Sequence, residues 1–291
     1  MDWSIAKILA WSTDYFQKKS VDAPRLNAEL LLGRALGLSR VQLYVQFDRP
    51  LTDAELAAFK ELVQRRAARE PLAYILRERE FYSLRFEVSP AVLIPRPETE
   101  ELVERGLEHL RRTHPAEPKI LDVATGSGCI PVALLKNLPG ARALAFDLSE
   151  EALALAQRNA ATLGVAERAE WLRHDLFQPW PEALAGPFDL ITANPPYVAE
   201  SEWATLEPEV REREPKLALV PGPSGTEAYA AILPQLPARL AAEGLALLEI
   251  GMTQGPALLE MARRFCTDLE ARVLPDLSGR ERFLEIGRHL P

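Results

Sequence analysis

The chain has 291 residues, of which 47% are hydrophobic and 26% are charged, so it is a folded protein of one or two domains and not a disordered one. Lys and Arg number 34 and Asp and Glu 42, and the resulting net charge of −8 counts against a general binder of duplex DNA. The two cysteines, Cys129 and Cys266, lie far apart in the sequence, which argues against a disulfide scaffold and favours a reducing compartment, the cytoplasm.

Residues 1–75 are predicted to form a small helical bundle. The first residues, MDWSIAKILAW, indicate an amphipathic helix and not a signal peptide, and Thr52 with Glu55 forms a capping box at the start of a later helix. We expect the bundle to recognise a macromolecular substrate; a simple cover for apolar surface is the alternative. Elsewhere, no apolar run approaches the ~20 residues of a membrane span, and no histidine stands at a metal-ligand spacing, so we expect neither membrane nor metal binding.

Residues 76–97 are predicted to link the bundle to the rest of the chain. The alternating stretch 80–88 indicates a short β-hairpin. Pro95 and Pro97 prevent a helix before Glu98.

Residues 98–291 alternate between predicted strands and helices. The strands are expected at 119–122, 141–146, 169–173, 188–193, 244–250, 269–274 and 283–287, and helices at 130–138, 150–163, 226–242 and 255–265. The last two strands have too short a connection for a parallel crossover and must be antiparallel. The pattern predicts an α/β fold with a doubly wound sheet and one reversed strand near its end.

A glycine loop, Asp122-Val123-Ala124-Thr125-Gly126-Ser127-Gly128, follows the first of these strands. Gly126 and Gly128 allow a tight turn and a close approach of the backbone to a ligand. Asp147 ends the next strand, where a carboxylate can accept hydrogen bonds from both ribose hydroxyls. An acid that only caps the following helix, at Ser149, is the plainer alternative. Together these features favour an adenosine-type cofactor.

The loop does not fit a dinucleotide, because the third glycine of that motif would stand at Pro131. A ligand without a pyrophosphate, such as S-adenosylmethionine, fits better. Asp175 follows the third strand and can accept from an adenine amino group, with Leu176 or Phe177 against the ring. An ordinary loop aspartate remains the alternative at this position.

Asn194-Pro195-Pro196-Tyr197 directly follows the predicted strand 188–193, so it opens into the same crevice as Gly126. The two prolines make a rigid turn. The Asn194 side-chain oxygen and the Pro195 carbonyl can both accept from one planar NH2 group, and the Tyr197 ring can lie against the group that carries it. This geometry suits a substrate amide or an amino-purine.

With these motifs the chain resembles the HemK-type N5-glutamine methyltransferases of peptide chain release factors. The resemblance covers nearly the whole length and rests on residues 94–100, 122–128, 194–197 and 276–282. It implies a class I S-adenosylmethionine-dependent methyltransferase fold with a seven-stranded sheet in residues 98–291. It also implies methyl transfer to the glutamine of a Gly-Gly-Gln motif, with S-adenosylhomocysteine as the second product.

The resemblance also assigns roles to individual residues. Catalysis falls to Asn194, Pro195 and Tyr197; substrate binding to Asn194, Pro195, Pro196, Tyr197 and Arg96; cofactor binding to Ala124, Thr125, Gly126, Ser127, Gly128, Asp147, Asp175, Leu176, Phe177 and Asn194. Two positions depart from the family pattern. Ala124 stands where the family usually has Gly, so a methyl group narrows the turn, and Leu176 stands where some members carry an aromatic residue.

Three other functions share parts of this pattern. An adenine-N6 DNA methyltransferase would hold a flipped adenine with the same Asn-Pro-Pro-Tyr turn, but the net acidity and the lack of a basic recognition region oppose it, and we expect no direct nucleic-acid partner. Glutamine methylation of a ribosomal protein is opposed by residues 94–100, which match the release-factor type. A non-catalytic cofactor-binding scaffold is opposed by the intact Asn-Pro-Pro-Tyr turn.

Overall fold

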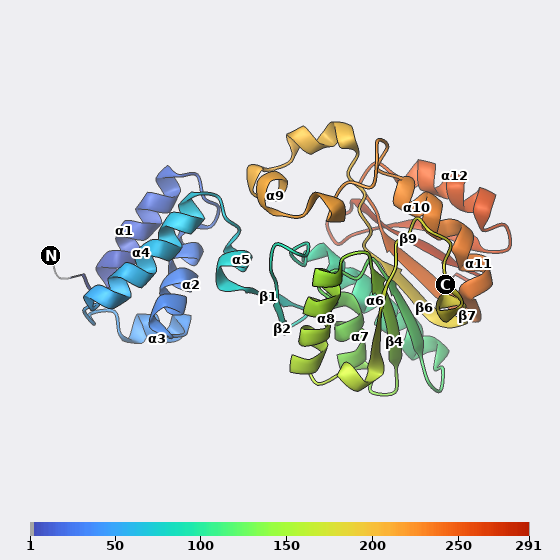
Figure 1. The fold of residues 1–291 in the computed structure, drawn as a ribbon, viewed down its shortest axis with the longest axis horizontal. Helices are drawn as coiled ribbons and strands as arrows, with labels where there is room; N and C mark the ends of the chain where they lie inside the picture. The colour runs from blue at the N-terminus through green and yellow to red at the C-terminus, as the bar shows by residue number, and fades with distance from the viewer. Residues whose placement is uncertain (1–2, 291) are drawn as a thin grey trace. The chain divides into compact units, whose positions relative to one another are not determined.

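The computed structural model describes residues 3–290, which form two compact units (Figure 1). Unit 1 contains the chain up to Glu78 together with a second segment, Glu207–Arg213, and unit 2 contains Arg79–Leu206 and the chain from Glu214 onward. Over residues 3–290, no helix combines the length and the apolar character needed to cross a membrane.

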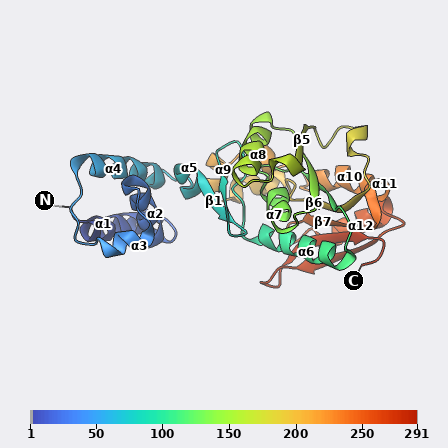
Figure 2. The same cartoon turned by 90° about the horizontal axis from the view of Figure 1, so that it is seen from below.

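The first part of unit 1, residues 3–78, forms five helices around one apolar core. They are α1 (Ile5–Lys18), α2 (Pro24–Leu36), α3 (Arg40–Val45), α4 (Asp53–Ala67) and α5 (Leu72–Leu76) (Figure 2). Of these, α2 contacts each of the other four. The predicted helical bundle is confirmed, and so is its capping box, in which Thr52 Oγ1 accepts from Glu55 N–H at 3.3 Å. The predicted N-terminal helix begins at Ile5; Met1 and Asp2 lie outside the described residues.

The segment Glu207–Arg213, which includes α9 (Pro208–Arg213), is held in unit 1 by charged side chains of α4 and the turn after it. The Glu209 carboxylate accepts from the buried Arg66 at 3.0 Å and from Arg69 at 3.4 Å, and Arg213 donates to the Ala68 carbonyl at 2.9 Å. The base of the loop that carries this segment is closed in unit 2, where Val198 N–H donates to the Leu219 carbonyl at 2.8 Å. The chain therefore leaves unit 2 for seven residues and returns to it.

Unit 2 contains a hairpin and a seven-stranded sheet. The hairpin pairs β1 (Glu78–Phe81) with β2 (Leu84–Glu87). The sheet has the order β5-β4-β3-β6-β7-β9-β8, with strands β3 (Lys119–Val123), β4 (Arg142–Asp147), β5 (Ala169–Arg173), β6 (Phe188–Ala193), β7 (Leu240–Glu249), β8 (Glu270–Pro275) and β9 (Glu281–Gly287). β3 to β7 pair in parallel, whereas β9 is antiparallel to both β7 and β8. The predicted fold class is confirmed, including the reversed last strand.

Helices cover both faces of this sheet (Figure 1). On one face are α6 (Glu98–Thr113), α7 (Cys129–Asn137) and α8 (Glu150–Thr162), and on the other α10 (Glu227–Ile232), α11 (Leu236–Arg239) and α12 (Gly255–Phe265). Successive strand residues point to opposite faces, so Ile120 of β3 packs with α6 and α7 while Leu121 packs with α10 and α12. The central strands β3 and β6 are therefore largely buried on both sides.

The helix predicted over 226–242 is wrong at its end, where residues 240–242 belong to a strand, and it is not one continuous helix. α10 ends at Ile232, a short 3-10 turn follows, α11 ends at Arg239, and β7 begins at Leu240. Pro234 and Pro237 each lack the N–H that a continuous helix needs, so the helical stretch is broken into short pieces. Leu240 instead pairs with Phe188 of β6, and the strand begins before the predicted 244.

Candidate active site

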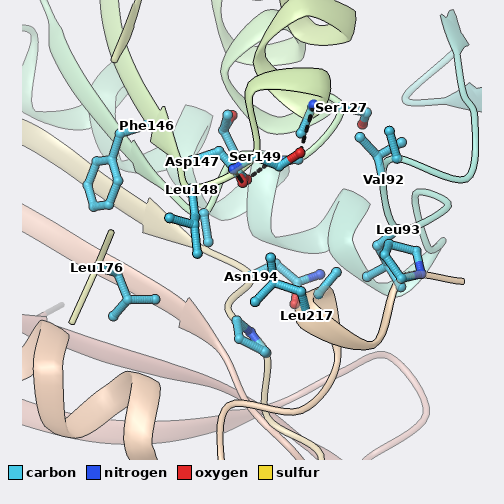
Figure 3. Close-up of a pocket in the computed structure, with 18 of the residues that line it drawn as sticks. Val92, Leu93, Ser127, Phe146, Asp147, Leu148, Ser149, Leu176, Asn194 and Leu217 are labelled. Carbon is cyan, nitrogen blue, oxygen red and sulfur yellow. Dashed lines mark hydrogen bonds between the residues drawn. The ribbon is translucent and has the colours of Figure 1, made fainter. Parts of the chain in front are cut away.

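A cavity of about 330 Å³ lies in unit 2 at the carboxyl ends of the central strands (Figure 3). Its walls come from the turns after β3, β4, β5 and β6, the predicted ligand side of a doubly wound sheet. Leu93 and Leu217, from segments far apart in the chain, complete the wall. The fold thus brings the separate sequence motifs to one place.

Most of the predicted site residues line this cavity. They are Arg96, Ala124, Thr125, Gly126, Ser127, Asp147, Asp175, Leu176, Phe177, Asn194 and Pro196. Gly128, Pro195 and Tyr197 are not part of the lining. Gly128 begins α7 in the left-handed conformation (φ 75°), and a Cβ there would approach Ala156 to 2.9 Å, so this glycine serves close packing.

At Gly126, in the turn after β3, the backbone faces the cavity without a side chain. Its φ of 55° is in the left-handed region, and its N–H donates to Asp147 Oδ2 at 2.8 Å. A Cβ at this position would meet no atom within 4 Å, so the backbone borders free space in the cavity. A ligand can therefore approach the main chain here without a side chain between them.

Asp147 is partly buried and already accepts two backbone hydrogen bonds. Oδ2 accepts from Gly126 N–H, and Oδ1 accepts from Ser149 N–H at 2.9 Å (Figure 3). Burial raises the pKa of the Asp147 carboxyl, against the lowering effect of these donors. Each carboxylate oxygen has a second lone pair, so the group can tie the glycine loop to the α8 turn and still accept from a ligand hydroxyl.

The turn after β5 forms another part of the wall. Asp175 Oδ1 accepts from Phe177 N–H at 3.0 Å, which fixes the turn, and Leu176 packs partly against the core beneath it. Phe177 is half exposed. An apolar surface beside one carboxylate suits a flat, polar-edged ligand.

Asn194 contributes an unsatisfied acceptor to the cavity. Its Nδ2 donates to Thr99 Oγ1 at 3.1 Å, whereas its buried Oδ1 has no hydrogen-bond partner among the described residues. A buried acceptor without a donor costs roughly 1–3 kcal/mol, so Oδ1 marks a place for an N–H or O–H of a ligand. The Tyr197 hydroxyl points elsewhere and donates to the buried Glu249 carboxylate at 3.4 Å, and burial raises the pKa of Tyr197.

Arg96 is engaged by a residue that the sequence did not reveal. Its guanidinium pairs with the buried Glu214 carboxylate at 2.6 Å, and the same carboxylate accepts from Ile94 N–H at 3.2 Å. Arg96 therefore lines the cavity as a fixed, partly exposed cation. Glu214 escaped notice because it lies in an irregular loop with no pattern to single it out.

Asp122 is a second residue without a predicted role. It is fully buried in β3; Thr192 Oγ1 donates to its Oδ1 at 2.6 Å, but neither its Oδ2 nor Thr125 Oγ1 has a hydrogen bond of normal geometry in residues 3–290. Burial raises the pKa of Asp122 to about 7. The signal in the sequence was a lone acid in an otherwise apolar strand, KILDV.

We expect Asp122→Asn to change how stability depends on pH. The folded pKa of about 7 lies above the ordinary 3.8, so the native state holds a proton that the unfolded chain releases between these values. The free energy of unfolding of the wild type therefore falls as pH rises from about 4 to 7, and the variant should lose this fall. Urea unfolding at pH 5 and pH 8 measures it, with the exposed Asp268→Asn as control. If the free energies of unfolding of wild type and variant differ by the same amount at both pH values, the raised pKa of Asp122 is contradicted.

We expect Ala124→Gly to stabilise the protein. Ala124 has a φ of 56°, and the left-handed region costs a residue with a Cβ about 1–2 kcal/mol. The greater freedom of glycine in the unfolded chain offsets roughly 0.5–1 kcal/mol, so a net gain of about 0.5–1 kcal/mol remains. Denaturant unfolding checks this against Ala154→Gly on the exposed face of α8, which should lose stability. A loss at both positions would mean that the Ala124 turn is unstrained.

Within residues 3–290, no group of three or more His, Cys, Asp or Glu side chains is arranged to hold a metal ion.

Two family models match parts of this chain. A family model described as the PrmC N-terminal domain matches residues 7–76, and one described as the methyltransferase small domain matches residues 103–209. Among solved structures, the hMettl16 catalytic domain in complex with the MAT2A 3'UTR hairpin 6 is similar in fold, with a TM-score of 0.57 and 18% identity over 79% of this chain and 83% of that one.

Curated relatives match over most of the chain. The release factor glutamine methyltransferase of Chlorobaculum tepidum is 46% identical over 85% of this chain and 85% of its own length. That of Geobacter sulfurreducens is 47% identical over 91% and 90%, and that of Rhodopirellula baltica 38% identical over 98% and 96%. With this identity over nearly its full length, the chain belongs to the family of release factor glutamine methyltransferases.

Proposed function

We propose that this protein transfers a methyl group from S-adenosylmethionine to the side-chain amide nitrogen of the glutamine in the Gly-Gly-Gln motif of peptide chain release factors. The observation that carries the proposal is the buried, unpartnered Asn194 Oδ1 in the cavity wall beside the glycine loop. An amide NH2 is the donor that this acceptor lacks. The family to which the chain belongs supports the same reaction.

The cavity has the groups that S-adenosylmethionine requires. The open backbone at Gly126 would border the cofactor, Asp147 would accept from its ribose hydroxyls, and Asp175 from its adenine amino group, with Leu176 and Phe177 along the ring. When bound, the cofactor supplies a methyl group on a positively charged sulfur.

The protein's own contribution is alignment and electrostatic support. An amide nitrogen is a poor nucleophile because its lone pair is delocalised. Asn194 Oδ1 and the Pro195 carbonyl would accept from the substrate NH2, hold its nitrogen in line and stabilise positive charge that develops there. The Tyr197 ring would lie beside the amide, although neither Pro195 nor Tyr197 lines the cavity in the described conformation. Arg96 would bind the substrate backbone from the same wall.

We also propose that unit 1 recognises the release factor. A pocket that fits one amide cannot choose one glutamine among many, so selection needs surface outside it, and a specific contact usually buries on the order of 800 Å² per partner. Unit 1 exposes apolar side chains on α3, with Val41 at 73% and Val45 at 80% exposure.

Both cysteines are buried and neither forms a disulfide, so we place the reaction in the cytoplasm.

The α3 surface gives this recognition role a direct test. Val45→Asp should raise the KM for an intact release factor about fivefold, the effect of one lost apolar contact of roughly 1 kcal/mol. The KM for a short Gly-Gly-Gln peptide should not change, because the peptide is too small to reach beyond the cavity. Lys60→Asp on α4 is the control, since this side chain is exposed and polar. Equal KM values for the release factor in wild type and Val45→Asp would exclude α3 from the contact.

The proposed reaction is tested by transfer of tritium from labelled S-adenosylmethionine. Purified release factor, a release factor with its Gly-Gly-Gln glutamine changed to alanine, ribosomal protein and adenine-rich DNA are compared side by side. Label on the first alone supports the proposal. Label on DNA would identify an adenine methyltransferase, label on ribosomal protein another glutamine substrate, and cofactor binding without transfer a scaffold.

A further inference from the structure

A chain of buried hydrogen bonds runs from the Asn194 turn into the interior of unit 2. Asn194 Nδ2 donates to Thr99 Oγ1 at 3.1 Å, and Thr99 Oγ1 donates to Glu249 Oε2 at 2.7 Å. Thr99 lies in the first turn of α6 and is 2% exposed; Glu249 ends β7 and is 1% exposed. Three elements distant in the sequence thus meet at the residue that carries the free acceptor.

The direction of each bond follows from the donor inventory of these groups. A carboxylate only accepts, so the single hydroxyl hydrogen of Thr99 is committed to Glu249. The Thr99 oxygen then has only lone pairs left, and it must meet the NH2 side of the Asn194 amide. The opposite side, Oδ1, is the one left without a partner. The direction of these hydrogen bonds therefore decides which end of the nearly symmetric Asn194 amide is free.

Glu249 is the last acceptor in this series of hydrogen bonds, and two tyrosine hydroxyls also donate to it. The Tyr197 hydroxyl donates to its other oxygen, Oε1, at 3.4 Å, and the Tyr229 hydroxyl donates to its backbone carbonyl at 2.6 Å. Burial raises the pKa of the Glu249 carboxyl, while the Thr99 and Tyr197 hydroxyls and the positive charge of Arg282 oppose that rise. A glutamine here would have one acceptor for two hydroxyl donors.

We propose that Thr99 and Glu249 are positioning residues that fix the amide orientation of Asn194, so that its carbonyl oxygen and not its NH2 group meets the substrate. This inference rests on the proposed function, since it assigns the Asn194 oxygen to the glutamine NH2. An amide turned by half a rotation would present two hydrogens to the two hydrogens of the substrate. The reaction would then lose both the alignment and the electrostatic support.

The first test removes only the hydroxyl. Thr99→Val keeps the shape of the side chain and should lower kcat for release factor methylation about tenfold, the worth of one hydrogen bond. Binding of S-adenosylhomocysteine and the KM for release factor should stay within about twofold, because a misoriented amide still occupies the same space. Thr99→Ser restores the hydroxyl and should restore kcat. Thr113→Val on the same helix is the matched control, because the Thr113 hydroxyl donates to the His109 carbonyl and makes no other hydrogen bond within residues 3–290.

A double-mutant cycle separates positioning from a structural role. If Thr99 acts through Asn194, Thr99→Val should change kcat less than about twofold in an Asn194→Ala background, because there is no amide left to orient. Independent, multiplying losses would overturn the inference. When Asn194 is present, Glu249→Gln should lower kcat in the same way as Thr99→Val. In the Asn194→Ala background it should likewise change kcat less than about twofold.

The two proposals fail in different ways. If the wild type transfers label to the release factor and Thr99→Val keeps its full kcat, the positioning inference is overturned and the proposed function stands. If Thr99→Ser is as slow as Thr99→Val, the hydroxyl is not the operative group and the inference is again overturned. If the wild type transfers no label to the release factor, the proposed function falls and the inference falls with it.

Discussion

Asn194→Ala is expected to lower kcat for release factor methylation by about 10²–10³-fold, the usual loss when one oriented hydrogen-bonding group is removed from a site of developing charge. The substitution removes Oδ1, the unpartnered acceptor in the cavity wall. It should leave the fold intact, because the only hydrogen bond of the Asn194 side chain among the described residues is the one to Thr99. Single-turnover transfer of labelled methyl at saturating cofactor measures the effect on chemistry.

Two further variants serve as controls for Asn194→Ala. Asn137→Ala should keep full activity, because Asn137 ends α7 and its Nδ2 donates, among the described residues, to the Ala133 carbonyl alone. Asn194→Asp keeps an acceptor but loses the NH2 that meets Thr99, so its kcat should lie between those of Asn194→Ala and the wild type. Turnover close to normal in Asn194→Ala would remove Asn194 from the reaction.

Asp147→Ala is expected to weaken S-adenosylhomocysteine binding about ten- to hundredfold, since hydrogen bonds to a charged group contribute roughly 1.5–3 kcal/mol. The structure adds a second reason. The carboxylate also accepts from Gly126 N–H and Ser149 N–H, so its loss frees the glycine loop from the α8 turn. The rate at saturating cofactor should change much less than the affinity, because these contacts are remote from the transferred methyl.

Calorimetry with S-adenosylhomocysteine measures this loss, and Asp268→Ala is the exposed control. Asp147→Asn should fall between wild type and Asp147→Ala, because an amide keeps one of the two backbone acceptors. Unchanged binding in Asp147→Ala would leave Asp147 with the loop and helix cap as its only role.

The sheet and its site-bearing turns were predictable because their signals are local. Buried strands such as 188–193 show as short apolar runs, and glycines and prolines mark where they end. The start of β7 at Leu240 was missed because the helical pattern of 226–239 runs straight into it, and only pairing with Phe188 makes it a strand. Strand boundaries of this kind are decided by tertiary contacts.

The turns after the strands were predicted as a group, but the residues behind them were not. Thr99 belongs to a motif that the sequence singled out, yet its partner Glu249 lies 150 residues away and only the closed sheet brings them together. The pairing of Arg66 with Glu209, 143 residues apart, is equally invisible in the sequence. No periodicity marks a six-residue helix as part of another unit.

The loop between Val198 and Leu219 has a consequence for any shortened form of this protein. Its two ends are clasped together, its tip is anchored by Arg66 and Arg69, and Pro215 and Leu217 on its returning arm belong to the cavity wall. A chain starting at Leu76 would lack Arg66 and Arg69. The loop would then gain conformational freedom next to the cavity wall. In such a shortened chain, a loss of substrate recognition could not be separated from disorder at the cavity wall. Single changes on α3 avoid this, because they keep Arg66 and Arg69 in place.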